Sequence, residues 1–236
     1  MSQLCLILFG APGSGKGTQA KLLTKALHVP HISTGDMLRE SAERGDDLGH
    51  EVQGILASGA LVPDEIVNAL VAERIGRKDS RRGFILDGYP RTVNQAKMVG
   101  RLLEQHGASA LVVHLKVDYN VIVERLAARR LCPICGAVYG VKAGEPKRTV
   151  CGLDGARLIV RDDDRPDVVR RRLANYDRQT APVLAYFEDA CYPRLDVDGD
   201  APGGPEAISR GIQAAVREHL ERQQLERTPG RRRERA

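Results

Sequence analysis

The feature that most constrains the fold is a glycine-rich loop between a short apolar run and an amphipathic segment. Residues Leu4–Gly10 are continuously apolar, which is typical of a strand buried on both faces of a parallel sheet. From Gly10 to Lys16 the sequence fits the pattern G-x-x-x-x-G-K, and residues 19–27 have helical spacing. A strand, this loop and a helix in succession predict a phosphate-binding P-loop in an α/β fold.

The residue types of this loop suit a polyanion. Glycines let successive backbone N–H groups turn inward around phosphate oxygens, and the following helix adds its positive end. Lys16 supplies a mobile charge for the β and γ phosphates. The usual Ser/Thr after the lysine is replaced by Gly17, so the usual hydroxyl ligand for Mg²⁺ is missing there. The predicted phosphate-binding residues are Gly13, Ser14, Gly15, Lys16, Gly17 and Thr18.

Beyond the loop, strand patterns alternate with helix patterns. We expect strands at the HIST segment, at 83–87, at 110–118 and at 194–198. Helices are expected from Asp36 to about Ser58, from Asp64 onward, at 92–106, at 121–130, as one long helix from Pro166 to about Asp189, and around Pro205 to Glu221. Such alternation predicts a parallel sheet with right-handed crossovers and helices on its flanks.

A cluster of cysteines interrupts this alternation. Its spacing is Cys132-x2-Cys135-x15-Cys151-x2-Asp154, which is typical of a two-knuckle structural zinc site with Asp as the fourth ligand. Four protein ligands leave no open position for a catalytic water, so we expect Zn²⁺ to stabilise a small insertion that cannot bury a core of its own. Iron or a redox role for the Cys132–Cys135 pair is the weaker alternative, because redox pairs usually open a helix after a strand.

Composition excludes some classes of protein. Apolar residues make up 42% and charged residues 28% of the 236, as in an ordinary soluble globular protein. Neither a signal-peptide pattern nor a run of about 20 apolar residues is present, so a cytoplasmic location without a membrane partner is expected. The net charge is +5, of which the five Arg and two Glu of residues 226–236 contribute +3. Because aromatic residues do not interleave this basic end, we expect a solvated tail and no nucleic-acid partner.

Further motifs follow the loop along the chain. These are STGDMLR at 33–39, LVPDEIV at 61–67, GFILDGYPRTVNQA at 83–96, RLAARRLCPICG at 125–136, RDDDRPDVVRRRL at 161–173, and YFEDA before LDVDG. With GAPGSGKGTQA they cover the chain from Leu4 to about Gly199. The set resembles the nucleoside monophosphate kinases, and specifically adenylate kinases of the bacterial type with a long, zinc-containing lid.

The resemblance implies reversible, Mg²⁺-dependent transfer of the terminal phosphoryl group of ATP to AMP, giving two ADP, and a role in nucleotide homeostasis and purine salvage. Phosphoryl transfer requires two polyanions held in line with their charge neutralised. Arginine suits this task because its planar group binds phosphate through two hydrogen bonds and stays charged. The many arginines of the motifs agree with this implication.

For AMP, the resemblance implies that Arg39 and Arg91 bind the phosphate, that Gln95 lies at the adenine, and that backbone near 60–62 and the Gly88 turn complete the base pocket. The implied AMP-binding residues are Thr34, Arg39, Ala60, Leu61, Val62, Gly88, Tyr89, Pro90, Arg91, Gln95, Arg161 and Arg172.

For ATP, the resemblance places Arg125 near the base and Arg129 on the phosphates, with lid contacts from Val138 and Tyr139. A backbone contact from Ala201 is also implied, although the segment reads VDGDA where VDGTK is a common form of the family. Asp87 is expected to position Mg²⁺ through water. The implied catalytic residues are Lys16, Asp87, Arg91, Arg129, Arg161 and Arg172.

The implied organisation has a P-loop core (1–32, 64–129 and 166–221), an NMP-binding helical insertion (33–63), a zinc-binding lid (130–165) and a basic, disordered tail (222–236). Both insertions are expected to close over a rigid core and exclude water, which would otherwise accept the phosphoryl group. A monomer is expected, since no coiled-coil pattern is evident.

Three alternatives remain open from the sequence. The first is a long-lid GTP:AMP phosphotransferase or a kinase for another monophosphate. The second is a zinc-ribbon nucleic-acid binder, which predicts clustered Lys/Arg with stacking aromatics. The third is a P-loop hydrolase or switch without an acceptor, which would not require the arginines of STGDMLR and DGYPR.

Overall fold

The computed structural model describes residues 3–43, 45, 47–140 and 148–226. At its centre lies a parallel five-stranded sheet in the order β2-β3-β1-β4-β7. These strands are β1 (Gln3–Phe9), β2 (His31–Ser33), β3 (Gly83–Asp87), β4 (Ala108–Lys116) and β7 (Arg194–Asp198). The predicted α/β fold with a parallel sheet is therefore confirmed.

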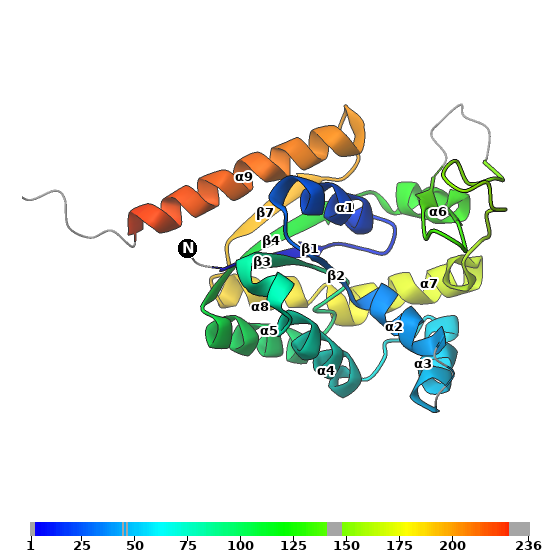
Figure 1. Ribbon diagram of the computed structural model, residues 1–236, viewed down its shortest axis with the longest axis horizontal. Coiled ribbons are helices and arrows are strands. Elements are labelled where there is room, and N and C mark those ends of the chain that lie inside the picture. Colours follow the sequence, from blue (N-terminus) through cyan, green and yellow to red (C-terminus); the bar gives the residue numbers. More distant parts are fainter. Residues whose placement is uncertain (1–2, 44, 46, 141–147, 227–236) are drawn as a thin grey trace, which may run out of the picture.

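Helices cover both faces of the sheet (Figure 1). Helices α1 (Lys16–Leu27) and α9 (Gly204–Glu226) lie on one face, and α4 (Asp64–Ile75), α5 (Val93–His106) and α8 (Val183–Asp189) lie on the other. A short 3₁₀ helix, η1 (Lys78–Arg82), precedes β3. Among the described residues, no helix has both the length and the apolar character needed to cross a bilayer.

Two groups of shorter elements lie beside this core. Helices α2 (Thr34–Glu43) and α3 (Asp47–Ser58) form the first group. The second comprises the antiparallel strands β5 (Arg130–Leu131) and β6 (Val138–Tyr139) and the 3₁₀ helix η2 (Asp162–Asp164). Helix α6 (Tyr119–Ala128) leads into the second group and α7 (Pro166–Asn175) leaves it.

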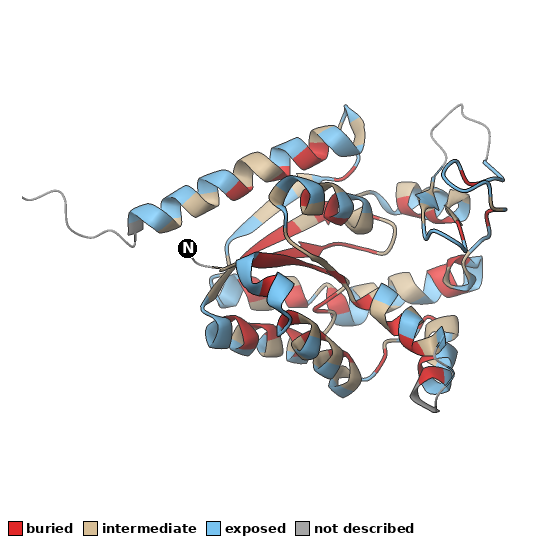
Figure 2. Cartoon of the chain, viewed as in Figure 1, coloured by how far each residue is buried: buried red, intermediate tan, exposed pale blue. Residues whose placement is uncertain are grey.

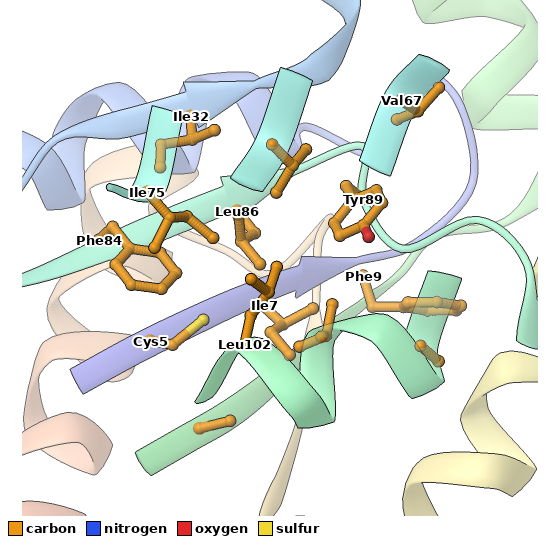
Figure 3. Close-up of a cluster of buried hydrophobic side chains, with 14 of the residues drawn as sticks. Cys5, Ile7, Phe9, Ile32, Val67, Ile75, Phe84, Leu86, Tyr89 and Leu102 are labelled. Carbon is orange, nitrogen blue, oxygen red and sulfur yellow. The ribbon is translucent and has the colours of Figure 1, made fainter. Parts of the chain in front are cut away.

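The core follows from the apolar strand runs. Because side chains alternate along a strand, Cys5, Ile7 and Phe9 of β1 face α5 and α8, whereas Leu6 and Leu8 face α1 and α9. Figure 2 shows the central strands β1, β3 and β4 as largely buried, whereas the edge strand β7 is partly exposed. Figure 3 shows apolar side chains of β1, β3, α4 and α5 meeting in one cluster. This two-sided burial gives the loops at the strand ends a rigid base.

The predicted long helix from Pro166 to Asp189 is wrong. Helix α7 ends at Asn175, a π-helical turn η3 (Tyr176–Thr180) follows, and α8 begins at Val183. Pro182 explains the break, because it lacks an N–H group and its ring collides with the carbonyl group four residues earlier in a continuous helix. The π turn is closed by the N–H of Ala181, which donates to the carbonyl of Tyr176 at 2.7 Å.

The predicted end of the last helix at Glu221 is also wrong. Helix α9 continues to Glu226, so residues 222–226 are helical instead of belonging to a disordered tail. The Ser109 hydroxyl donates to Gln223 Oε1 at 3.0 Å, which attaches this last part of α9 to the start of β4. The Arg-rich residues 227–236 lie outside the described residues.

A pair of glycines tests this packing. Gly83 has a φ of 132°, and a Cβ there would lie 2.6 Å from the Leu4 carbonyl oxygen of the neighbouring strand. We expect Gly83→Ala to lower the free energy of unfolding by at least about 2 kcal/mol, measured by urea denaturation. The same change at Gly211, an exposed position of α9 with nothing near its Cβ, should raise it by about 0.5–1 kcal/mol. Equal effects at both positions would contradict this account of the sheet.

Candidate active site

The P-loop connects β1 to α1 at the carboxyl edge of the sheet. Gly10, Gly13 and Gly15 have φ values of 144°, 86° and 96°, which glycine adopts without strain. At Gly10 a Cβ would lie 2.7 Å from the Leu115 carbonyl oxygen. Gly15 precedes α1 without a side-chain cap, so the first N–H groups of this helix are available to an anion.

Lys16 lies inside the loop. Its Nζ donates to the carbonyl oxygens of Gly10 and Ala11, each at 2.8 Å. Burial lowers the pKa of Lys16 to about 8, a shift that Asp87 opposes and that the positive charges of Arg91, Arg172 and Arg129 reinforce. A polyanion bound here would relieve this repulsion.

The loop opens into a cleft of about 1930 Å³, well above the volume that one small ligand requires. A smaller hollow beside α2 shares Arg39, Gly88, Arg91 and Arg172 with it. All predicted nucleotide-binding residues line one of the two. The cleft is lined by Gly13–Thr18, Arg39, Leu61, Asp87–Arg91, Arg125, Arg129, Val138, Tyr139, Arg161, Arg172 and Ala201, and the hollow adds Thr34, Ala60, Val62 and Gln95.

Three arginines that line the cleft come from separate segments and pair with two aspartates behind its wall. Arg129 pairs with Asp164, whose side chain is fully buried, through Nε and Oδ2 at 2.7 Å. Arg161 binds Asp163 at 2.7 Å, and Arg172 Nη1 lies 3.1 Å from the same carboxylate. Burial lowers the pKa of Arg172 to about 10. Burial acts against ionisation of Asp163, yet Arg172 and Arg161 lower its pKa to about 2.

Beside the hollow, Arg39 of α2 pairs with Asp36 and reaches its wall. Gln95 is buried there, and each end of its amide makes one hydrogen bond. Its Nε2 donates to Asp64 Oδ1 at 2.8 Å, and its Oε1 accepts from the Arg91 N–H at 2.7 Å. Tyr89 is 1% exposed, and its ring belongs to the apolar core, so only its backbone can face the cleft.

Asp87 ends β3 beside the P-loop. Its Oδ2 lies 3.1 Å from His31 Nε2, and a Cβ at Gly17 would lie 3.4 Å from the same oxygen. Gly17 thus leaves the space in front of this carboxylate open. A hydrated Mg²⁺ ion fits such a place, because it keeps several waters and needs few protein ligands.

Arg125 of α6 also lines the cleft. Its Nη2 donates to the Gly199 carbonyl oxygen at 3.0 Å and to Asp200 Oδ1 at 2.8 Å. Asp200 is one of the two positions at which VDGDA departs from the common family form. It therefore holds the orientation of the Arg125 guanidinium group.

The predicted metal ligands come together. One ligand atom each from Cys132, Cys135, Cys151 and Asp154 lies within 4.8 Å of the others. Cys132 and Cys151 are buried, and the Cys135 and Cys151 sulfur atoms are 3.6 Å apart. Three thiolates and one carboxylate in a compact group fit a tetrahedral Zn²⁺ ion.

The sequence motifs contain further residues of the site for which no role was predicted. Asp163 and Asp164 belong to RDDDRPD. Three acidic residues between arginines could have indicated internal ion pairs. His31 belongs to HIST but carries no signal by itself. Thr180 donates to the Arg91 carbonyl oxygen at 2.9 Å, a contact that depends on the π turn and that no motif indicates.

Comparison with known proteins agrees with this geometry. The family model "Adenylate kinase" matches residues 8–192. The sequence is 48% identical over 207 residues to an adenylate kinase of Anaeromyxobacter dehalogenans strain 2CP-1, covering 87% of this chain and 95% of that relative. An adenylate kinase of Pseudothermotoga lettingae is 46% identical over 184 residues, or 77% and 85% of the two chains. By its sequence and its fold, the chain belongs to the adenylate kinase family.

Proposed function

We propose that the chain carries out the reaction of its family by holding ATP and AMP end to end across the cleft. Adenylate kinases are phosphotransferases that convert MgATP and AMP reversibly into two ADP. The observation that carries the proposal is that Lys16 of the P-loop and Arg91, Arg129 and Arg172 line the same cleft. Such a group of fixed positive charges stabilises a phosphoryl group in transfer between two anions.

On the donor side, the P-loop N–H groups and Lys16 would hold the β and γ phosphates of ATP. Arg125, fixed by Asp200, would face the base, and Val138, Tyr139 and the backbone of Ala201 would contact the nucleotide. Asp87 would position Mg²⁺ through its waters, in the space that Gly17 leaves open. The ion would neutralise charge on the phosphates.

On the acceptor side, Arg39 and Arg91 would bind the AMP phosphate, and the base would enter the hollow beside α2. Thr34, Ala60–Val62, Gly88 and Gln95 line that hollow. Gln95 gives one amide hydrogen to Asp64 and accepts one hydrogen bond from the Arg91 N–H group, so its second amide hydrogen and second oxygen lone pair would bond the adenine. Arg129, Arg161 and Arg172 would exchange their aspartates for the transferring phosphoryl group.

Zinc is proposed for the Cys132, Cys135, Cys151 and Asp154 cluster, where it would supply structural cross-linking. We further propose residues 33–63 as the moving AMP-binding insertion, residues 130–165 as the lid, and a cytoplasmic monomer. Val138 and Tyr139 form β6 next to Cys135, so the metal would hold the donor-side wall in shape. No observation favours the nucleic-acid binder or the acceptor-free hydrolase.

Arg39 tests the acceptor assignment. A charge-assisted bond to phosphate is lost in Arg39→Ala, so we expect the KM for AMP to rise roughly 10- to 100-fold while the KM for ATP stays nearly constant. A coupled assay of ADP formation measures both, with AMP, CMP, UMP and GMP as acceptors and ATP and GTP as donors. Arg77→Ala, an exposed position just beyond α4, serves as control. A better acceptor than AMP would overturn the base assignment.

Lys16 predicts a pH dependence. Its pKa is about 8 in the folded protein, against 10.5 for a freely solvated lysine. Between about pH 8 and 10.5 the unfolded chain binds more protons at Lys16 than the folded protein does. The free energy of unfolding therefore rises with pH in this range, as the cost of burying the charged lysine is removed. The charge that binds ATP phosphate is lost over the same range. We expect kcat/KM for ATP to fall roughly tenfold per pH unit above about pH 8.

The control for that profile is Lys16→Arg, whose side chain stays charged. It should lose activity at every pH but lack the alkaline decline near pH 8. An unchanged decline in this variant would assign the ionisation to another group.

The cysteine cluster predicts metal-dependent stability. Purified protein should contain about one Zn²⁺ per chain by elemental analysis, and a strong chelator should lower the midpoint of thermal unfolding by several degrees. Cys135→Ser should abolish metal content, whereas Cys191→Ser, an exposed cysteine outside the cluster, should not. Full zinc content in Cys135→Ser would contradict the ligand assignment.

A further inference from the structure

Helix α3 of the AMP-binding insertion ends against helix α7 of the core. Its last residue, Ser58, is followed by Gly59, which has a φ of 76°. The last carbonyl groups of a helix have no partner within the helix and require one from outside. Here the partners come from α7, which contacts α3 and lies beside it (Figure 1).

Two side chains of α7 bind these carbonyl groups. Arg171 Nε donates to the Ser58 oxygen at 2.7 Å, and Asn175 Nδ2 donates to the Gly59 oxygen at 3.0 Å. Arg171 also places its positive charge at the negative end of the α3 dipole. Its Nη2 is held by Asp167 Oδ2 at 2.9 Å.

Gly59 allows this approach because it has no side chain. A Cβ there would lie 3.0 Å from Val168 Cγ1 and 3.2 Å from Arg172 Cγ. The end of α3 therefore rests on the aliphatic stem of Arg172, and the guanidinium group of that arginine continues to the Asp163 carbonyl oxygen at 2.9 Å. The contact at Gly59 thus joins the AMP-binding insertion to the turn of α7 that carries Arg172, which lines the cleft.

The residues that follow Gly59 form a wall of the acceptor hollow. Ala60, Leu61 and Val62 line it together with Gly59 and Arg172. A displacement of the Gly59 turn would move this wall relative to Arg172 by the same amount. The position of the wall thus depends on the two hydrogen bonds from α7.

We propose that Arg171 and Asn175 are positioning residues for the acceptor nucleotide. They fix the end of α3 on α7 and so set the distance between the base-binding wall and the Arg172 guanidinium group. The inference rests on the proposed AMP site. Arg171 lines neither the cleft nor the hollow, and Asn175 lines the cleft but not the hollow, so their effect on AMP would pass through residues 59–62.

Steady-state kinetics of the full-length protein tests this. Without the hydrogen bond, AMP must order the wall when it binds, so Asn175→Ala should raise the KM for AMP about fivefold. The KM for ATP and kcat at saturating AMP should change by less than about twofold. Arg171→Ala should act similarly, the double variant should exceed either, and Arg171→Lys, which keeps a cationic donor, should restore most of the AMP affinity.

A matched control separates this role from general effects on α7. Arg170→Ala removes the neighbouring exposed arginine and should keep the KM for AMP. A double variant with lowered thermal stability but an unchanged KM for AMP, or with equal rises for AMP and ATP, would overturn the proposal. If Arg39→Ala also left the KM for AMP unchanged, the AMP site itself would be misplaced, which is a separate failure.

Discussion

The structure depends on keeping several like charges close together inside a cleft. Guanidinium groups at 91, 129 and 172 lie near Lys16, and Arg161 lies near Arg172, so these positive charges would repel one another strongly with little water between them. Asp163 and Asp164 balance them, and Asp163 stays ionised because Arg172 and Arg161 face it. In the proposed mechanism, substrate phosphates would replace Asp163 as the partner of Arg161 and Arg172, which requires less new desolvation than bringing phosphates to bare arginines.

The parallel sheet places these groups at one edge. All five strands run in the same direction, so the segments after β1, β2, β3 and β7 leave from the same side. They bring the P-loop, Thr34, Asp87 and Gly199 together from distant parts of the sequence. Apolar packing on both faces holds the strand ends in register (Figure 2). A site of this type needs that rigidity because phosphoryl transfer depends on alignment.

Much of the site was predictable because backbone and charge requirements leave marks in the sequence. Gly10, Gly13 and Gly15 have positive φ, and Lys16 follows at a fixed spacing. The metal cluster was predictable because its four ligands follow a characteristic spacing in the sequence. Tertiary contacts were harder to predict from the sequence. The ring of Tyr89 packs in the core although its motif faces the cleft, since adjacent residues of a turn point in different directions. Pro182 could have indicated the break between α7 and α8. Nothing in the sequence indicated that Thr180 bonds to the Arg91 carbonyl oxygen.

That break also explains why one stretch of chain serves several parts of the site. Residues 166–180 begin with α7, which binds the end of α3 through Arg171 and Asn175 and sends Arg172 into the cleft. In a continuous α-helix, Thr180 would stand at a different angle relative to α7. The π turn adds one residue to the turn and directs the Thr180 hydroxyl to the Arg91 carbonyl oxygen. The same segment therefore fixes Arg91 and Arg172 relative to each other, so its irregular geometry would serve the alignment of these two arginines, which we propose bind phosphate.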